Sequence, residues 1–194
     1  MERYSLSDWK GRKRMKLLIA SDIHGSSWYC EKLLNVYKEE GAQRMILLGD
    51  ILYHGPRNDL PAEYAPKKVI EMLNAYKDEI HAVRGNCEAE VDQMVLQFPV
   101  LADYMLLFWK ERAVYVTHGH IYNEGNRPPM RTGDVLLHGH THVLRAEEKD
   151  GIILLNPGSV SIPKEGNPPT YAVYEDGRFS IRDFEGNTVK EIIL

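Results

Sequence analysis

Cysteine is scarce in this sequence, whose 194 residues contain only Cys30 and Cys87. Two cysteines cannot form a disulfide framework, and their spacing matches none of the paired patterns of structural zinc sites. Long apolar runs are missing as well, because runs such as 45–48 and 152–155 are far too short to cross a bilayer. No apolar signal core follows the basic N-terminus. These absences argue against a secreted disulfide scaffold and a membrane-spanning chain, and we expect a cytoplasmic protein.

An excess of positive charge is also lacking, since 24 Lys and Arg face 28 Asp and Glu, for a net charge of −4. The chain has no global positive field to attract nucleic acid or an anionic membrane, so a charged substrate must be held by a local site. With 43% hydrophobic and 27% charged residues, the composition is that of a globular protein. We expect a polar, flexible extension over residues 1–14 and one domain over residues 15–194.

Three short apolar runs in the first half, 17–20, 45–48 and 80–83, have the length of buried strands, and each leads into a polar loop. Apolar residues recur at helical spacing after the first and second runs, and Gly41 stands where the first helix would stop. These residues are Cys30, Leu33, Leu34 and Tyr37, and then Val69, Met72, Leu73 and Tyr76. The pattern predicts consecutive βα units around a largely parallel sheet.

The second half of the sequence contains more strand-like runs than helical periods. The runs lie at 105–109, 113–117, 135–137, 152–155, 171–174 and 179–184. A chain that is rich in βα units first and in strands later closes naturally as a second sheet packed on the first, with helices outside. We therefore expect an α/β fold.

Histidine is concentrated in two of the polar segments. Four of the eight histidines stand in the runs Thr-His-Gly-His at 117–120 and Gly-His-Thr-His at 139–142. Because the carboxyl ends of parallel strands share one edge of a sheet, side chains just beyond those ends can converge. Seven residues able to bind a metal follow predicted strands in this way: Asp22, His24, Asp50, Asn86, His118, His140 and His142.

The chemistry of these side chains favours a metal centre. Oxygen donors from Asp and Asn, combined with neutral imidazoles, suit divalent Mn, Fe, Zn, Co or Ni. Two cations about 3.5–4 Å apart would need a bridging carboxylate, and Asp50 is the lone acid in the middle of the set. Taken singly, Asp22 could equally cap a helix, and Asp50 and Asn86 could be ordinary turn residues. The joint placement of all seven favours the metal centre.

The ordered motifs around these residues resemble those of the calcineurin-like metallophosphoesterases. The resemblance covers nearly everything after Met15, and the segment 156–164 is most similar to the small bacterial phosphodiesterases of the YfcE type. The motifs are Asp22-x-His24, Gly49-Asp50, Gly85-Asn86-Cys87-Glu88, His118-Gly119-His120 and Gly139-His140-Thr141-His142.

The resemblance implies a four-layer α/β/β/α sandwich and an enzyme that hydrolyses phosphoester bonds by attack of a metal-activated hydroxide. It implies two divalent metal ions, Mn²⁺ as the first expectation and Zn²⁺, Fe²⁺, Co²⁺ or Ni²⁺ as the others. A small phosphodiester or phosphorylated metabolite is the expected substrate, and a homo-oligomer the expected assembly. One ion would lie among Asp22, His24, Asp50 and His142, and the other among Asp50, Asn86, His118 and His140.

One position departs from the family pattern, because the usual Gly-Asn-His, whose histidine helps to protonate the leaving group, is here Gly-Asn-Cys with Cys87. A thiol with an ordinary pKa of about 8.5 is a poor substitute for imidazolium near neutral pH. Either good leaving groups are preferred, or His54 or His120 assists, with His54 slightly favoured by its loop position. Arg57 and Asn86 are candidates for contacting the substrate phosphate.

The catalytic candidates are therefore Asp50, Asn86, His54, Cys87 and His120. The alternative function is a non-catalytic protein-interaction scaffold on the same fold, similar to the retromer subunit Vps29, which also lacks the histidine of Gly-Asn-His. Cys87 keeps this alternative open. The complete set of seven ligand-type side chains favours the enzyme, since a scaffold need not keep them chemically competent.

Overall fold

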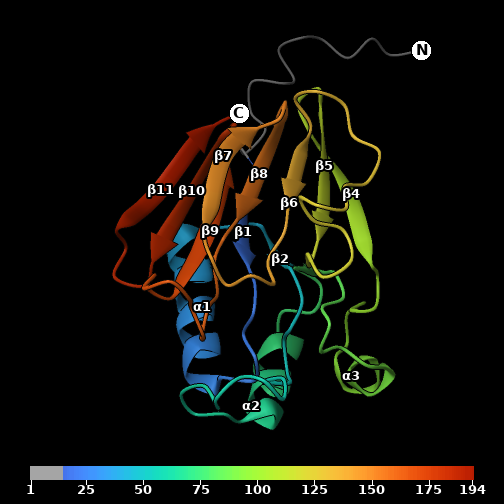
Figure 1. Ribbon diagram of the computed structural model, residues 1–194. Coiled ribbons are helices and arrows are strands. Elements are labelled where there is room, and N and C mark those ends of the chain that lie inside the picture. Colours follow the sequence, from blue (N-terminus) through green and yellow to red (C-terminus); the bar gives the residue numbers. More distant parts are fainter. Residues whose placement is uncertain (1–14) are drawn as a thin grey trace, which may run out of the picture.

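Two mixed β-sheets lie face to face in the computed structural model, which describes residues 15–194 (Figure 1). The expected flexible extension over residues 1–14 lies outside the described residues and stays a prediction. The α/β class is confirmed by the structure, because helices accompany the two sheets.

The first sheet has six strands in the order β11-β10-β9-β1-β2-β3. Its parallel part matches the predicted βα units and consists of β1 (Lys16–Ala20), β2 (Arg44–Leu47) and β3 (Ile80–Ala82). The rest is antiparallel and comes from the C-terminal end of the chain: β9 (Thr170–Glu175), β10 (Arg178–Asp183) and β11 (Thr188–Ile193). The runs at 171–174 and 179–184, which we expected in the second sheet, therefore return to the first.

The second sheet has five strands in the order β4-β5-β6-β8-β7. They are β4 (Tyr104–Trp109), β5 (Arg112–Thr117), β6 (Val135–Leu137), β7 (Arg145–Lys149) and β8 (Ile152–Asn156). Strands β5, β6 and β8 are parallel to one another, and the edge strands β4 and β7 are antiparallel to their neighbours. The arrowheads of β6 and β8 point the same way in Figure 1, so the loops that follow them leave at the same side of the sheet.

Helices α1 (Ser27–Glu40) and α2 (Pro66–Asn74) cover the outer face of the first sheet. A short third helix, α3 (Glu90–Val95), follows β3 and buries none of its residues. The side chain of Ser26 caps the start of α1, and Gly41 ends it in the left-handed conformation with φ of 61°. Apolar residues of α1 and α2 form one core cluster with alternate residues of β1 and β2, such as Leu18 and Met45. None of these helices is both long and apolar enough to cross a bilayer.

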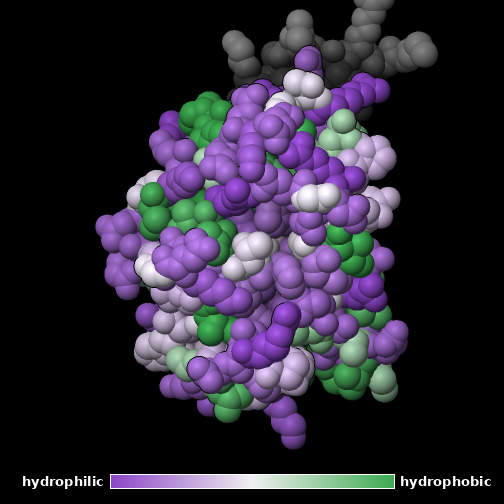
Figure 2. Space-filling view, in the orientation of Figure 1, coloured by the Kyte–Doolittle hydropathy of each residue, from purple (hydrophilic) through white to green (hydrophobic). Residues whose placement is uncertain are grey.

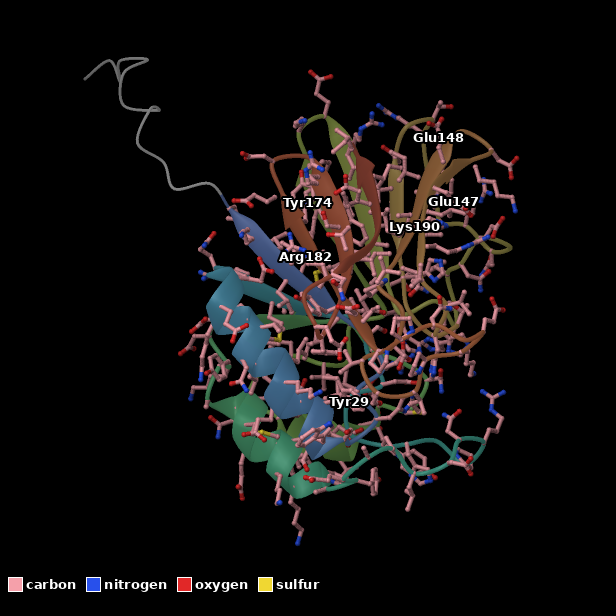
Figure 3. The ribbon with its side chains drawn as sticks, turned by 90° about the vertical axis from the view of Figure 1, so that its left-hand side faces the viewer. Tyr29, Glu147, Glu148, Tyr174, Arg182 and Lys190 are labelled. Carbon is pink, nitrogen blue, oxygen red and sulfur yellow. The ribbon has the colours of Figure 1, made fainter. Side chains whose placement is uncertain are left out.

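A second core fills the space between the sheets. The residues of β1 and β2 that point away from the helices, such as Ile19 and Ile46, pack here against residues of β5 and β6. Trp109 of β4 and Tyr174 of β9 stack with ring centroids 3.8 Å apart, which joins the two sheets directly. At one side, Lys190 of β11 lies beside Glu147 of β7, and Arg182 of β10 pairs with Glu40 of α1 (Figure 3).

The outer face of the second sheet is covered by a loop. Among the described residues no helix follows α3, so the fourth layer is built from the segment 119–133 between β5 and β6. Met130 of this loop packs with Tyr115 against a small cluster formed by Leu136, Ile152 and Leu154. The hydroxyl of Tyr115 donates a hydrogen bond to the carbonyl oxygen of Pro129 at 2.6 Å. The face of the molecule seen in Figure 2 is largely hydrophilic, with separate apolar patches.

Candidate metal centre

The loops that follow five strands meet at one end of the sandwich. The loops after β1, β2 and β3 come from the first sheet, and those after β5 and β6 come from the second. These loops carry the seven residues singled out in the sequence, and the structure brings them together. The possible ligand atoms form three groups, and the atoms within each group lie within 4.8 Å of one another. The groups are Asp22 with His24 and His142, Asp50 with His118 and His140, and His24 with Asp50 and Cys87.

Asp50, a member of the second and third groups, also faces the first. Its Oδ2 is 3.7 Å from Nε2 of His24 and 3.5 Å from Nε2 of His118. On one side, Oδ1 of Asp22 lies 3.2 Å from Nε2 of His142. On the other, Oδ1 of Asn86 lies 3.1 Å from Nε2 of His118. A single carboxylate therefore faces both halves of the cluster.

Backbone carbonyls fix the orientation of three histidine rings. Nδ1 of His24 lies 2.8 Å from the carbonyl of Tyr53, and the Nδ1 atoms of His118 and His142 lie 2.7 Å and 2.6 Å from the carbonyls of Leu48 and Ile162. Since a carbonyl oxygen can only accept, each Nδ1 must donate. The Nε2 atom of each neutral ring then keeps its lone pair directed into the cluster, which is the arrangement of metal-binding histidines.

When the histidine rings are neutral, as metal binding requires, several of these polar atoms face one another without a hydrogen between them to share. Nε2 of His24 and Nε2 of His142 are 3.3 Å apart, and both rings already donate through Nδ1. Oδ1 of Asp22 is buried and has no hydrogen-bond donor among the described residues. Lone pairs that converge in this way repel unless a cation lies between them. The donor set fits divalent cations.

The backbone at these positions is strained. Asp22, His24, Asp50, His140 and His142 all adopt positive φ, between 50° and 66°. Residues with a Cβ rarely adopt this left-handed conformation, and it persists where the surrounding structure enforces it. Five of the seven predicted ligands share it, which turns their side chains sharply from the strand direction towards the cluster.

Glu88 fixes the loops that carry Asp50 and Asn86. Its carboxylate accepts hydrogen bonds from the backbone N–H groups of Asp50, Ile51 and Gly85 at 2.8, 2.7 and 2.5 Å. Gly85 cannot be replaced easily, because a Cβ there would collide with Oδ1 of Asp50. We assigned no role to Glu88 from the sequence, although an acid directly after the Gly-Asn-Cys motif was the available signal.

The segment 156–164 holds the loop of Asp22. The hydroxyls of Ser159 and Ser161 donate to the carbonyl oxygen of Asp22 at 3.0 and 3.1 Å. Asn156 donates to the carbonyl of Gly139 at 2.9 Å, next to His140. This segment, which carried part of the family resemblance, therefore supports the cluster without contributing a ligand to it.

The buried charges in the cluster depend on one another. Burial acts to raise the pKa of Asp22 and of Asp50, but the neighbouring histidines prevail and hold the pKa of both carboxyls below the ordinary range. For His118, burial acts to lower the pKa, and Asp50 outweighs it and raises the pKa to about 9. Burial and the charge of His118 lower the pKa of His140 to about 4. The two aspartates are thus ionised and attract positive charge.

The candidates for proton transfer lie at different places. The ring of His120 is 5.4 Å from that of His118, beside the cluster. The ring of His54 is held between the rings of Tyr53 and Tyr64, at 4.8 and 5.2 Å, and belongs to none of the three ligand groups.

Cys87 does belong to one of these groups, and its backbone N–H donates to Oδ1 of Asp50 at 2.9 Å. Burial and then the charge of Asp50 raise the pKa of its thiol.

A polar cavity of about 410 Å³ opens over the cluster. Arg57, which we predicted as a phosphate contact, lines it together with Lys164, which the sequence did not single out. Neither cation has an ion-pair partner among the described residues. The backbone N–H of Lys164 donates to the carbonyl of His142 at 3.1 Å, which ties its loop to the cluster.

Two stacked mixed sheets with Asp, Asn and His gathered at their strand ends define an α/β sandwich with a candidate metal centre. The model of the calcineurin-like phosphoesterase superfamily domain matches residues 15–176. The chain therefore belongs to the calcineurin-like phosphoesterase superfamily, and the predicted enzyme class is confirmed.

Known proteins of similar sequence and structure support the same family. The phosphodiesterase YfcE of Escherichia coli is 47% identical over 167 residues, which cover 86% of this chain and 91% of YfcE. The solved structure of YfcE, a phosphoesterase from E. coli, matches with a TM-score of 0.90 at 44% identity and covers 92% of this chain and 99% of that one. The resemblance to the YfcE type is thus confirmed.

The structure of Vacuolar Protein Sorting 29 from Cryptosporidium parvum has a TM-score of 0.61 to this chain at 17% identity. The match covers 94% of this chain and 100% of that one, and it shows a shared fold alone.

Proposed function

We propose that this protein is a dinuclear metal-dependent phosphodiesterase. The position of Oδ2 of Asp50, 3.7 Å from Nε2 of His24 and 3.5 Å from Nε2 of His118, carries the proposal, because one oxygen there can serve two cations. The similarity to YfcE, named a phosphodiesterase, supports the reaction. When bound, the two cations supply a hydroxide nucleophile and neutralise the charge on the phosphoryl oxygens.

The chain would hold the two cations with two overlapping sets of residues. Oxygen and imidazole donors of this kind suit Mn²⁺ as the first candidate, with Zn²⁺, Fe²⁺, Co²⁺ and Ni²⁺ as alternatives. Glu88 and the two serines of the segment 156–164 hold the backbone of Asp50 and of Asp22 in place. The first set is Asp22, His24, Asp50 and His142, and the second is Asp50, Asn86, His118 and His140.

The polar cavity would bind the phosphate of a small phosphodiester. Arg57 and Lys164 are free to contact the nonbridging oxygens, and the Nδ2 group of Asn86 can donate to the same oxygens. His120, at the edge of the cluster, is placed to hold a proton near the reacting group. His54, held between the rings of Tyr53 and Tyr64, stays a candidate for this role alongside His120.

Cys87 restricts the substrates. Its thiol stands where the family resemblance places a proton-donating histidine, and its raised pKa makes it a very weak acid near neutral pH. Esters whose leaving alcohol is itself acidic need no protonation, so they are the substrates that this centre would favour.

The test removes the charge of the Asp50 carboxylate, which would hold both cations. Protein stripped of metal and reloaded with Mn²⁺ is assayed with bis(4-nitrophenyl) phosphate and with 4-nitrophenyl phosphate. We expect the diester to be hydrolysed faster, and Asp50→Asn to lower this activity by at least about 100-fold, the upper end of what altered support of a metal site costs. Asp59→Asn, an exposed acid in the following loop, is the matched control and should keep the activity.

Two results would contradict the proposal. One is equal activity of Asp50→Asn and Asp59→Asn. The other is the absence of hydrolysis with every divalent ion tried, and this second result would favour the scaffold alternative.

A further inference from the structure

An apolar groove adjoins the metal centre on the side of the helices. It has a volume of about 440 Å³ and lies between the beginning of α2 and α3. Its wall is formed mainly by apolar and aromatic side chains. They include Tyr53, Tyr64, Ile70, Cys87, Val91 and Val95. Large apolar side chains are unusually exposed here, with Tyr53 at 42% and Val91 at 59%. Concave apolar surface of this kind is typical of a ligand site.

Cys87 connects the groove to the reacting centre. Its Sγ lies within 4.8 Å of the ligand atoms of both His24 and Asp50, and the same residue lines the groove. A molecule seated in the groove would therefore have one end beside the metal ligands. The groove is thus continuous with the site rather than a separate surface feature.

The charge of the groove indicates what kind of group it accepts. Its one charged lining residue is Asp92, whose Oδ2 accepts a hydrogen bond from the backbone N–H of Ala89 at 2.8 Å. A negative charge there disfavours a second phosphate. The two unpaired cations, Arg57 and Lys164, line the polar cavity instead. The two openings beside the centre therefore suit opposite substituents, one anionic or polar and one apolar.

We propose that the groove binds the leaving alcohol of the substrate, and that this alcohol is an aryl or other apolar one. The inference rests on the proposed phosphodiesterase function and adds its substrate class. It is consistent with the thiol of Cys87 at the mouth of the groove, because a phenol leaves as its anion without a proton from the protein. Water supplies the oxygen that replaces the aryl oxygen on phosphorus, and its proton neutralises the released phenolate in solution.

Three diesters distinguish this proposal from its alternatives. The parent is methyl 4-nitrophenyl phosphate. The second carries a butyl chain on its nitrophenol, with matched acidity of the phenol, and the third carries the butyl chain on the alcohol that stays on phosphorus. We expect kcat/KM of the Mn²⁺-loaded protein to rise about tenfold for the second diester, which is what burial of roughly two methylene groups gives. The third diester should show little gain.

Variants of α3 locate the effect. Val91→Glu places a charge in the groove. It should reduce the ratio of kcat/KM for the second diester to kcat/KM for the parent towards one. Met94→Glu is the matched control, because Met94 is 82% exposed on the same helix and does not line the groove, so it should keep the ratio.

A gain on the third diester instead of the second, or equal ratios in the two variants, would overturn the groove proposal. If none of the three diesters is hydrolysed, the proposed function itself fails, and the groove proposal fails with it.

Discussion

At the scale of single residues, Glu88 shows how much of this site depends on a side chain that is not itself a candidate metal ligand. Its carboxylate gathers three backbone N–H groups from two loops, one after β2 and one after β3. Those loops bear Asp50 and Asn86. Residue type alone identifies Asp50 and Asn86 as possible ligands. The role of Glu88 follows from its contacts with two loops that are distant in sequence.

Replacing Glu88 by Gln should weaken both the fold and the metal centre. Gln keeps one accepting oxygen, but the NH₂ group that replaces the other oxygen can only donate, so at least one buried N–H would lose its partner. We expect the free energy of unfolding to fall by about 1–3 kcal/mol, together with weaker Mn²⁺ binding. Urea denaturation and calorimetric titration measure the two effects. Glu71→Gln, at an exposed position of α2, is the control, and equal behaviour of the two variants would refute the positioning role.

At the scale of elements, the sequence predicted the strands with apolar runs and missed those without them. The run at 135–137 matches β6, and the expected end of the first helix at Gly41 is observed. Strands β7 and β11 lie at sheet edges, where one side of the strand is solvated. Their polar sequences, Arg-Ala-Glu-Glu-Lys and Thr-Val-Lys-Glu-Ile-Ile, therefore carry no buried run that could have marked them.

The site was more predictable than the sheet order. All seven predicted ligands follow strands, and that local pattern is present in the sequence. The return of β9–β11 to the first sheet depends on long-range pairing, such as that of Leu18 with Val173, which no local pattern encodes. Lys164 was missed for the same reason, because its loop reaches the cluster through contacts that are distant in sequence, such as the hydrogen bond to His142.

The covering loop over the second sheet should loosen in acid. Glu124 of this loop pairs with Arg145 at 2.6 Å and with Lys149, both on β7, and these partners lower its pKa to about 2 from an ordinary 4.5. A lowered folded-state pKa stabilises the fold above pH 4.5, and this contribution is lost as the pH falls towards 2. We expect the melting temperature of the wild type to be higher than that of Glu124→Gln at about pH 6. This gap in melting temperature should shrink below pH 4.5.

Thermal melts at several pH values measure the gap. Glu148→Gln is the control, because Glu148 is an exposed acid of β7 (Figure 3), and its gap to the wild type should stay constant. A gap for Glu124→Gln that does not depend on pH would disprove the ion-pair explanation.

At the scale of the whole molecule, the proposed centre joins the two sheets. Asp22, His24, Asp50 and Asn86 belong to loops of the first sheet, whereas His118, His140 and His142 belong to loops of the second. Cations bound between them would cross-link the sandwich at one end. The cytoplasmic location and the homo-oligomer expected from the sequence stay predictions.

Metal binding should therefore stabilise the entire fold. Mn²⁺ at about 100 times its dissociation constant adds about 2.7 kcal/mol per site, which raises the melting temperature of a domain of this size by about 5–10 °C. Differential scanning calorimetry of stripped and reloaded protein measures this rise. Asp50→Asn should lose most of it and Asp59→Asn should keep it. An unchanged melting temperature on reloading would argue against a cross-link between the sheets.

The stack of Trp109 on Tyr174 lies at the end of the sandwich opposite the cluster, since Trp109 pairs with Arg112 at the start of β5 and Tyr174 with Leu17 near the start of β1. Each of these two strands thus begins at the stack and ends at the ligands. The aromatic pair fixes the position of one sheet relative to the other, because a shift between the sheets would move the ligands of the first sheet away from those of the second. Substitutions that loosen this stack should therefore lower turnover at the far end of the sandwich as well as stability.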